Sequence, residues 1–192
     1  MQTERQTQIM EMALELITEK GIQGLTIKNL SKKIGISEPA IYRHFESKND
    51  ILLTILDGFK EMGGMFAGMM DNFEGTAIDK IQFMFTKMIG LFIEKPSLVG
   101  VIFSEEIFIN EESLKHSVIE IQNINQSTVE NIIKKGKENN DVRQDVDSKN
   151  LALIIMGSLR LLVKNWSLNS YNFDLEKEGE ILIESLNKII SP

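Results

Sequence analysis

Apolar residues recur at three- and four-residue spacing along most of this 192-residue chain, the pattern of α-helices that each bury one face. Strict alternation of apolar and polar residues, which indicates a strand, is rare, and the chain contains only three prolines. The pattern therefore predicts an all-α protein. Breaks in the apolar period divide it into about nine helices.

The positions of caps and turns give the expected helix limits. A short helix is predicted over 27–34, because Thr26 precedes it as an N-cap and Gly35 follows it. Another is predicted over 38–45 with Ser37 as its N-cap. The other helices are expected in residues 1–20, 48–72, 77–94, 97–108, 111–137, 148–168 and 175–190. Five of them have an expected cap at their start, in chain order Ser47, Thr76, Ser97, Ser148 and Asp174, and no cap is assigned to 1–20 or 111–137.

The segment 26–50 reads as a helix-turn-helix. Within its second short helix Ile41 and Phe45 share one face and are the expected buried pair, which leaves the neighbouring polar side chains outside. Arg43 has the geometry to pair with both acceptors of a guanine, and Tyr42 to bond a phosphate. Ala40 suits contact with a thymine methyl group. This is the arrangement of a unit that reads double-stranded DNA.

Residues from about 9 to 56 resemble the TetR family of transcriptional regulators. The resemblance is carried by the segment GIQGLTIKNLSKKIGIS, by the run SEPAIYRHFESK at 37–48 and by the Asp-Ile-Leu that follows at 50–52. It implies that Thr26, Tyr42 and Lys48 hold backbone phosphates and that side chains of the second short helix face bases. The full set of residues expected to contact DNA is Thr26, Lys28, Ser37, Glu38, Pro39, Ala40, Tyr42, Arg43, His44 and Lys48.

The charge distribution favours DNA binding by one end of the chain only. The net charge is −7, yet residues 1–50 hold seven Lys and Arg against seven Asp and Glu, so the whole excess lies in residues 51–192. An acidic body is repelled by DNA, and Lys28, Lys32, Lys33 and Lys48 supply the charge near the reading helix. We expect a DNA-binding domain at 1–48 and a ligand-binding and dimerisation domain at 49–192.

The predicted helix at 148–168 is apolar on more of its circumference than one contact face needs. A second buried face is implied, and the resemblance implies that the last two helices pack with their copies into a four-helix dimer interface. The alternative is the central helix of a monomer. The residues expected in the interface are Leu151, Ile155, Leu159, Leu162, Trp166, Leu182, Leu186 and Ile189.

Methionine and phenylalanine are concentrated in the middle of the chain. Flexible thioether side chains suit a cavity for hydrophobic ligands of irregular outline, although ordinary core packing explains the same composition. By resemblance this region forms an effector pocket, expected to contain Met62, Met65, Phe66, Met69, Phe83, Phe85, Met88, Phe92 and Phe103. Acidic residues nearby, Asp71, Glu105 and Glu106, would admit a cationic lipophile, while the apolar lining would suit an acyl chain. Gly63 and Gly64 form a candidate kink through which ligand binding would tilt the DNA-binding domain.

Other function classes find little support. The absence of cysteine excludes disulfides, thiolate metal sites and cysteine nucleophiles. Glu112, His116 and Glu120 have a spacing that chelates a divalent ion, but such a row is usually a solvated helix face and lacks a fourth ligand. We expect no catalytic residue, metal or cofactor. No signal peptide or membrane span is expected either, since no run of about 18 apolar residues occurs.

Together these observations predict a cytoplasmic, ligand-responsive transcriptional regulator. The expected form is a homodimeric repressor that a small hydrophobic effector releases from its double-stranded DNA operator, without any membrane partner. One alternative is a DNA-binding regulator with a filled core and no effector. Another, from a different class, is a helical-bundle metal protein.

Overall fold

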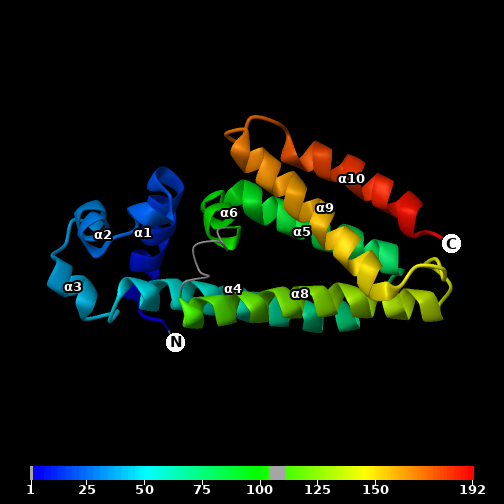
Figure 1. Cartoon of the computed structure of the whole chain (residues 1–192), viewed down its shortest axis with the longest axis horizontal. Helices are drawn as coiled ribbons and strands as arrows, with labels where there is room; N and C mark the ends of the chain where they lie inside the picture. Colours follow the sequence, from blue (N-terminus) through cyan, green and yellow to red (C-terminus); the bar gives the residue numbers. More distant parts are fainter. Residues whose placement is uncertain (1, 104–110) are drawn as a thin grey trace. The chain divides into compact units, whose positions relative to one another are not determined.

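A computed structural model describes residues 2–103 and 111–192, and every regular element in these two ranges is helical (Figure 1). The described residues form nine α-helices and one 3₁₀ turn, so the all-α prediction is confirmed. In chain order these are α1 (Glu4–Lys20), η1 (Ile22–Gly24), α2 (Ile27–Ile34), α3 (Glu38–Tyr42), α4 (Lys48–Asn72), α5 (Ala77–Glu94), α6 (Ser97–Ile102), α8 (Glu112–Glu138), α9 (Ser148–Leu168) and α10 (Leu175–Ile190).

Most helices begin where the sequence predicts. The side chains of Thr26, Thr76 and Asp174 each accept a hydrogen bond from the amide three residues on, as N-caps do. Two predicted caps are wrong by one residue, since Ser97 and Ser148 are the first helical residues. For α9 the cap is the preceding aspartate, whose carboxylate accepts two backbone hydrogen bonds. The second half of the helix predicted over 97–108 lies outside the described residues.

The described chain divides into two compact units, and the division does not fall at residue 48. The first unit comprises the described residues of 1–61 and 96–121, and the second comprises residues 62–95 and 122–192. The first half of α4 belongs to the same unit as the helix-turn-helix, because its side chains are buried there, namely Ile51, Leu52, Ile55 and Leu56. The segment 96–121 joins it because α6 packs on α1.

In the first unit, α1 provides the central surface. Its buried residues, Ile9, Ala13, Leu16 and Ile17, recur at three- and four-residue spacing and therefore form one face. This face contacts η1, α2 and α6. An ion pair between Lys60 and Glu120 joins α4 to α8 within the same unit.

In the second unit, α10 lies along both α5 and α9 (Figure 1). The core contains two fully buried phenylalanines from α5, Phe85 and Phe92, with Ile155 and Val163 from α9. The loop between α8 and α9 is hydrogen-bonded to the start of α5 and to the end of α10. Asp141 accepts a hydrogen bond from the first amide of α5 at 3.1 Å, and Arg143 donates its backbone amide to the carbonyl of Ile190 at 2.9 Å.

By length and hydropathy alone, α9 is the one described helix apolar enough to cross a membrane, although no span is expected from the sequence. The core helix of a soluble protein passes the same test. One side of α9 does pack into the second unit, through Leu151, Ile155, Leu159 and Val163. The high hydropathy of α9 therefore comes from two apolar sides, one of which is buried in the second unit.

Candidate nucleic-acid interface

The turn between α2 and α3 depends on Gly35, which has a left-handed backbone with φ of 78°. Its amide and that of Ile36 both donate to the carbonyl of Ser31, at 2.9 and 3.0 Å, so the end of α2 is satisfied before the chain reverses. At the other end of α2, the Thr26 hydroxyl accepts from the amide of Asn29 at 3.1 Å. Local sequence thus fixes both ends of this helix.

The reading helix α3 is shorter than predicted, because it ends at Tyr42 rather than near Phe45. The amides of His44 and Phe45 both donate to the carbonyl of Ile41, at 2.9 and 3.1 Å, which tightens the last turn. Ser37 occupies the N-cap position, but its side chain makes no capping hydrogen bond, so that part of the prediction is wrong.

Along α3 and the turn that follows it, buried and exposed side chains are divided as the sequence predicts. Ile41 and Phe45 are buried to 0% and 2% exposure and attach the helix to its unit. Tyr42 is 51% exposed, and Arg43 is also exposed. The side-chain amide of Gln6, on α1, donates a hydrogen bond to the carbonyl of His44, just after α3. The helix is therefore anchored on one side and open on the other.

The start of α4 is fixed beside α3. The Ser47 hydroxyl accepts from the amide of Asp50 at 3.1 Å, and the Asp50 carboxylate accepts from the amide of Glu46 at 2.9 Å. These two bonds pair side chain and backbone in both directions, much as a capping box does. Lys48, at the first position of α4, is half-buried and so restricted in direction.

One lysine of the predicted basic surround is already engaged. Lys33 lies 2.7 Å from a carboxylate oxygen of Glu19 and 3.2 Å from one of Glu15, both on α1. Hydrogen bonding to Glu19, and next to Glu15, raises the pKa of Lys33 above its ordinary value. Lys33 therefore links α2 to α1, whereas Lys28 and Lys32 are exposed.

The ten residues predicted to contact DNA lie in α2, in α3 with its flanking residues and at the start of α4. Seven are exposed, while Ala40, His44 and Lys48 are half-buried. Their contacts with DNA remain a prediction.

The residues predicted for an effector pocket do not share one environment. Met62, Met65 and Met69 are exposed, whereas Phe85 and Phe92 are completely buried in the core. Two aromatic residues that are half-buried, Phe66 and Phe83, stack on each other with ring centroids 6.3 Å apart. Met88 is half-buried, and Phe103 belongs to the first unit rather than the second. The three methionines are thus on the surface of the chain, and the effector pocket remains a prediction.

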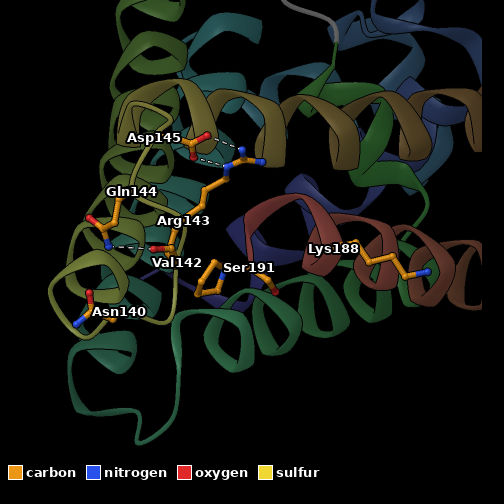
Figure 2. Close-up of a pocket in the computed structure, with 8 residues that line it drawn as sticks. Asn140, Val142, Arg143, Gln144, Asp145, Lys188 and Ser191 are labelled. Carbon is orange, nitrogen blue, oxygen red and sulfur yellow. Dashed lines mark hydrogen bonds and ion pairs between the residues drawn. The ribbon is translucent and has the colours of Figure 1, made fainter.

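Two cavities of the second unit contain none of those nine residues. The larger, of about 520 Å³, is lined by the loop between α8 and α9 and by the end of α10 (Figure 2). Its Arg143 is occupied, because the guanidinium pairs with Asp145 at 2.6 and 2.7 Å and also donates to the carbonyl of Ile189. Figure 2 shows Lys188 extending away from that pair. The Arg143 guanidinium is therefore satisfied by groups of the chain itself.

The smaller cavity, of about 150 Å³, lies between α4 and α8. Asp71 lines it and pairs with Lys135 at 2.8 Å. The hydrogen bond from Lys135 lowers the pKa of Asp71. The other two acids considered for a cationic ligand, Glu105 and Glu106, lie outside the described residues.

The residues predicted for a dimer interface differ in exposure, and their role in dimerisation remains a prediction. Leu151, Ile155, Leu159, Trp166 and Leu186 are buried inside the chain itself, so they have almost no surface to offer a second subunit. Leu162 and Leu182 are half-buried and Ile189 is exposed. The apolar residues of α9 and α10 that are exposed, here termed the α9–α10 seam, are Leu153, Ile154, Leu161, Leu168, Ile181 and Ile189.

In the row of Glu112, His116 and Glu120, the last two residues take part in side-chain pairing. Glu120 pairs with Lys60 and lies 3.3 Å from the His116 ring, and hydrogen bonding from Lys60 lowers the pKa of Glu120. Within residues 2–103 and 111–192, no group of three acidic, histidine or cysteine side chains is placed to hold a metal ion.

Comparison with known proteins identifies the family. Residues 9–55 match "Bacterial regulatory proteins, tetR family", and residues 78–192 match "MAATS-type transcriptional repressor, C-terminal region". The fatty acid metabolism regulator protein of Bacillus subtilis (strain 168) is 24% identical over 182 residues, covering 93% of this chain and 92% of the relative. The probable acrEF/envCD operon repressor of Escherichia coli (strain K12) is 24% identical over 197 residues, covering 96% and 86%.

Solved structures share the fold over nearly the whole chain. The transcriptional regulator FadR from Bacillus subtilis, in complex with stearoyl-CoA, has a TM-score of 0.78 and 24% identity, covering 94% of this chain and 96% of that one. The ketosteroid transcriptional regulator KstR2 of Mycobacterium tuberculosis has a TM-score of 0.84 and 16% identity, covering 100% and 97%. These relatives are transcriptional regulators, and the protein is not an enzyme. The chain belongs to the TetR family of transcriptional regulators.

Proposed function

We propose that the protein is a homodimeric repressor that acts in the cytoplasm and leaves its operator when a small hydrophobic effector binds. The observation that carries the proposal is the division of α3 and the turn after it into a buried pair, Ile41 and Phe45, and an exposed side with Tyr42 and Arg43. A helix anchored by buried residues on one side presents the side chains of its other side to a major groove at fixed positions.

The side chains beside α3 supply two kinds of contact. Phosphate contacts from Thr26, Tyr42 and Lys48 would set the position of the module on the duplex without reading sequence. Arg43 would read guanine through two hydrogen bonds, and Ala40 would distinguish thymine by its methyl group. Since one module makes few contacts, two modules on one duplex are needed for useful affinity.

Fluorescence anisotropy of a duplex from upstream of the protein's own gene tests this assignment. Wild type should bind with strong salt dependence and in the presence of random competitor DNA. Tyr42→Phe and Lys48→Ala should each weaken binding by about five- to tenfold, and Lys48→Ala should reduce the salt slope by about one per subunit. Lys95→Ala, which removes an exposed lysine of the second unit, serves as the matched control and should change nothing. Equal loss in all three variants would contradict the assignment.

The α9–α10 seam supports the dimer. Leu153, Leu161 and Leu168 are 61%, 59% and 72% exposed, and they lie seven or eight residues apart on one side of α9. Leucine side chains exposed in a row are unfavourable in water and are typical of a surface that another chain covers. We place the dimer contact on this seam instead of on the buried residues expected from sequence.

The effector class is proposed from the relatives. The fatty acid metabolism regulator protein and the stearoyl-CoA complex of FadR concern acyl compounds, so we propose a long-chain acyl-CoA or fatty acid. A second candidate is a regulator without an effector, and it is favoured by the complete burial of Phe85 and Phe92 in a filled core.

Release from DNA separates these candidates. Stearoyl-CoA, coenzyme A alone and a long-chain quaternary amine would each be titrated into the protein–operator complex, with anisotropy as the readout. Release by stearoyl-CoA at concentrations where coenzyme A has no effect supports the acyl effector. Release by the amine alone supports a cationic lipophile, and no release by any of the three supports the regulator without an effector.

A further inference from the structure

The three methionines assigned to an effector pocket from the sequence form an exposed row on α4. Met62, Met65 and Met69 lie three and four residues apart, so they share one side of the helix. They are 39%, 75% and 52% exposed. Met70 follows Met69 and is turned about 100° further around the helix, and it is only 2% exposed. One helix therefore presents thioether sulfurs both to solvent and to the core.

The surroundings of this row keep it accessible. A Cβ atom built on Gly64 or on Gly68, which lie in the same stretch of α4, would have open space around it. Among the methionines that the structure describes, these three are the exposed ones, and the rest are half-buried or buried. Exposure thus separates them clearly from Met70 and from Met84, which is 6% exposed.

The chemistry of an exposed thioether is oxidation. In proteins, cysteine thiolates and methionine thioethers are the usual targets of two-electron oxidants, and this chain contains no cysteine that would compete. With hypochlorous acid, the sulfur gains an S–O bond while the O–Cl bond breaks. Sulfur loses two electrons, chlorine takes them and leaves as chloride, and one proton is released.

We propose that Met62, Met65 and Met69 form a modification site where hypohalous acids or chloramines convert thioethers to sulfoxides without disturbing the fold. The added oxygen is polar, and at these positions it is placed in water instead of in the core. Met65 reacts first because it is the most exposed of the three. The modification is reversible by methionine sulfoxide reductases, of which one enzyme is needed for each sulfoxide epimer.

The test is peptide mass spectrometry of the full chain after timed exposure to limiting hypochlorous acid. We expect oxidation at Met65 and Met69 to be about tenfold faster than at Met70 and Met84, with Met62 in between. The same reaction in strong denaturant is the control, because there all sites should react at similar rates. A Met62→Leu, Met65→Leu, Met69→Leu variant should lose the fast phase while keeping its thermal midpoint.

Two results would overturn the proposal. One is oxidation of Met70 or Met84 as fast as that of Met65 in the native protein, which would mean that exposure does not select the site. The other is loss of helical circular dichroism or of thermal stability during the fast phase, which would mean that the reaction is damage to the fold. Recovery of the original mass after treatment with both reductases completes the expected result.

Discussion

Replacement of glycine by alanine at two exposed positions of α4 should stabilise the second unit. Gly64 and Gly68 lie within the helix Lys48–Asn72, and a Cβ atom at either position has open space around it. Alanine is favoured over glycine in a helix interior by about 1 kcal/mol, because the unfolded chain loses less freedom on folding. With no steric penalty to subtract, the double variant should gain about 1.5–2 kcal/mol, less at Gly68 because it is near the helix end.

Urea denaturation followed by the fluorescence of Trp166, the only tryptophan, measures this gain within the same unit. For a slope of about 2 kcal/mol per molar urea, the midpoint should rise by about 1 M with an unchanged slope. Gly63→Ala is the matched control. Its Cβ would lie 3.3 Å from the Asn125 side-chain oxygen and 3.4 Å from Ile124, so the propensity gain should be offset by crowding.

A midpoint that falls in Gly64→Ala would refute this reasoning, as would a larger gain from Gly63→Ala. If the Gly64→Ala, Gly68→Ala double variant is stabilised as expected, it also tests the predicted kink at residues 63 and 64. A stiffened α4 should then need more effector to release DNA, whereas unchanged release would contradict a role for bending at these glycines.

Three further substitutions probe other contacts of the second unit. Gly136→Ala should cost about 2–3 kcal/mol in urea denaturation, because its Cβ would lie 2.5 Å from neighbouring side-chain atoms; stability equal to wild type would show that the α8–α9 loop yields freely. Leu161→Glu should raise the dimer dissociation constant at least about 100-fold in sedimentation, while Ile93→Glu, at 43% exposure on α5, should leave it unchanged. Pairing with Arg143 lowers the pKa of Asp145 from 3.8 to about 2, so the ionised carboxylate stabilises the folded chain above about pH 4 and this contribution is lost between about pH 4 and 2. Arg143→Ala should return that pKa towards 3.8 in an NMR titration, and an unmoved titration would contradict the pairing.

Local features of the fold could be predicted from sequence because they depend on neighbours in the chain. The N-cap at Thr26 and the left-handed Gly35 need only a few adjacent residues, and the structure has both. The buried pair Ile41 and Phe45 follows from helical spacing alone. The early end of α3 was missed because it depends on two amides that share one carbonyl, a detail that residue types do not reveal.

Features that depend on tertiary packing could not be predicted in the same way. The helix α9 has two apolar stripes, and its sequence does not say which stripe its own chain covers; the structure buries Ile155 and exposes Leu161. Likewise, Lys33 has the same local sequence signal as the free lysines near it. Its partners, Glu15 and Glu19, come from a helix far enough along the chain that only the fold brings them together.

The central claim, that exposed residues of α3 read DNA sequence for a dimer, is tested most directly by selection of duplexes from a random library. Wild type should enrich two inverted half-sites whose centres lie about one or more helical turns apart. Arg43→Ala should relax the preference at a single base pair in each half-site, while Lys48→Ala should weaken binding to all sequences alike. Failure to enrich any sequence, or the same enriched site with unchanged preference in Arg43→Ala, would contradict the account.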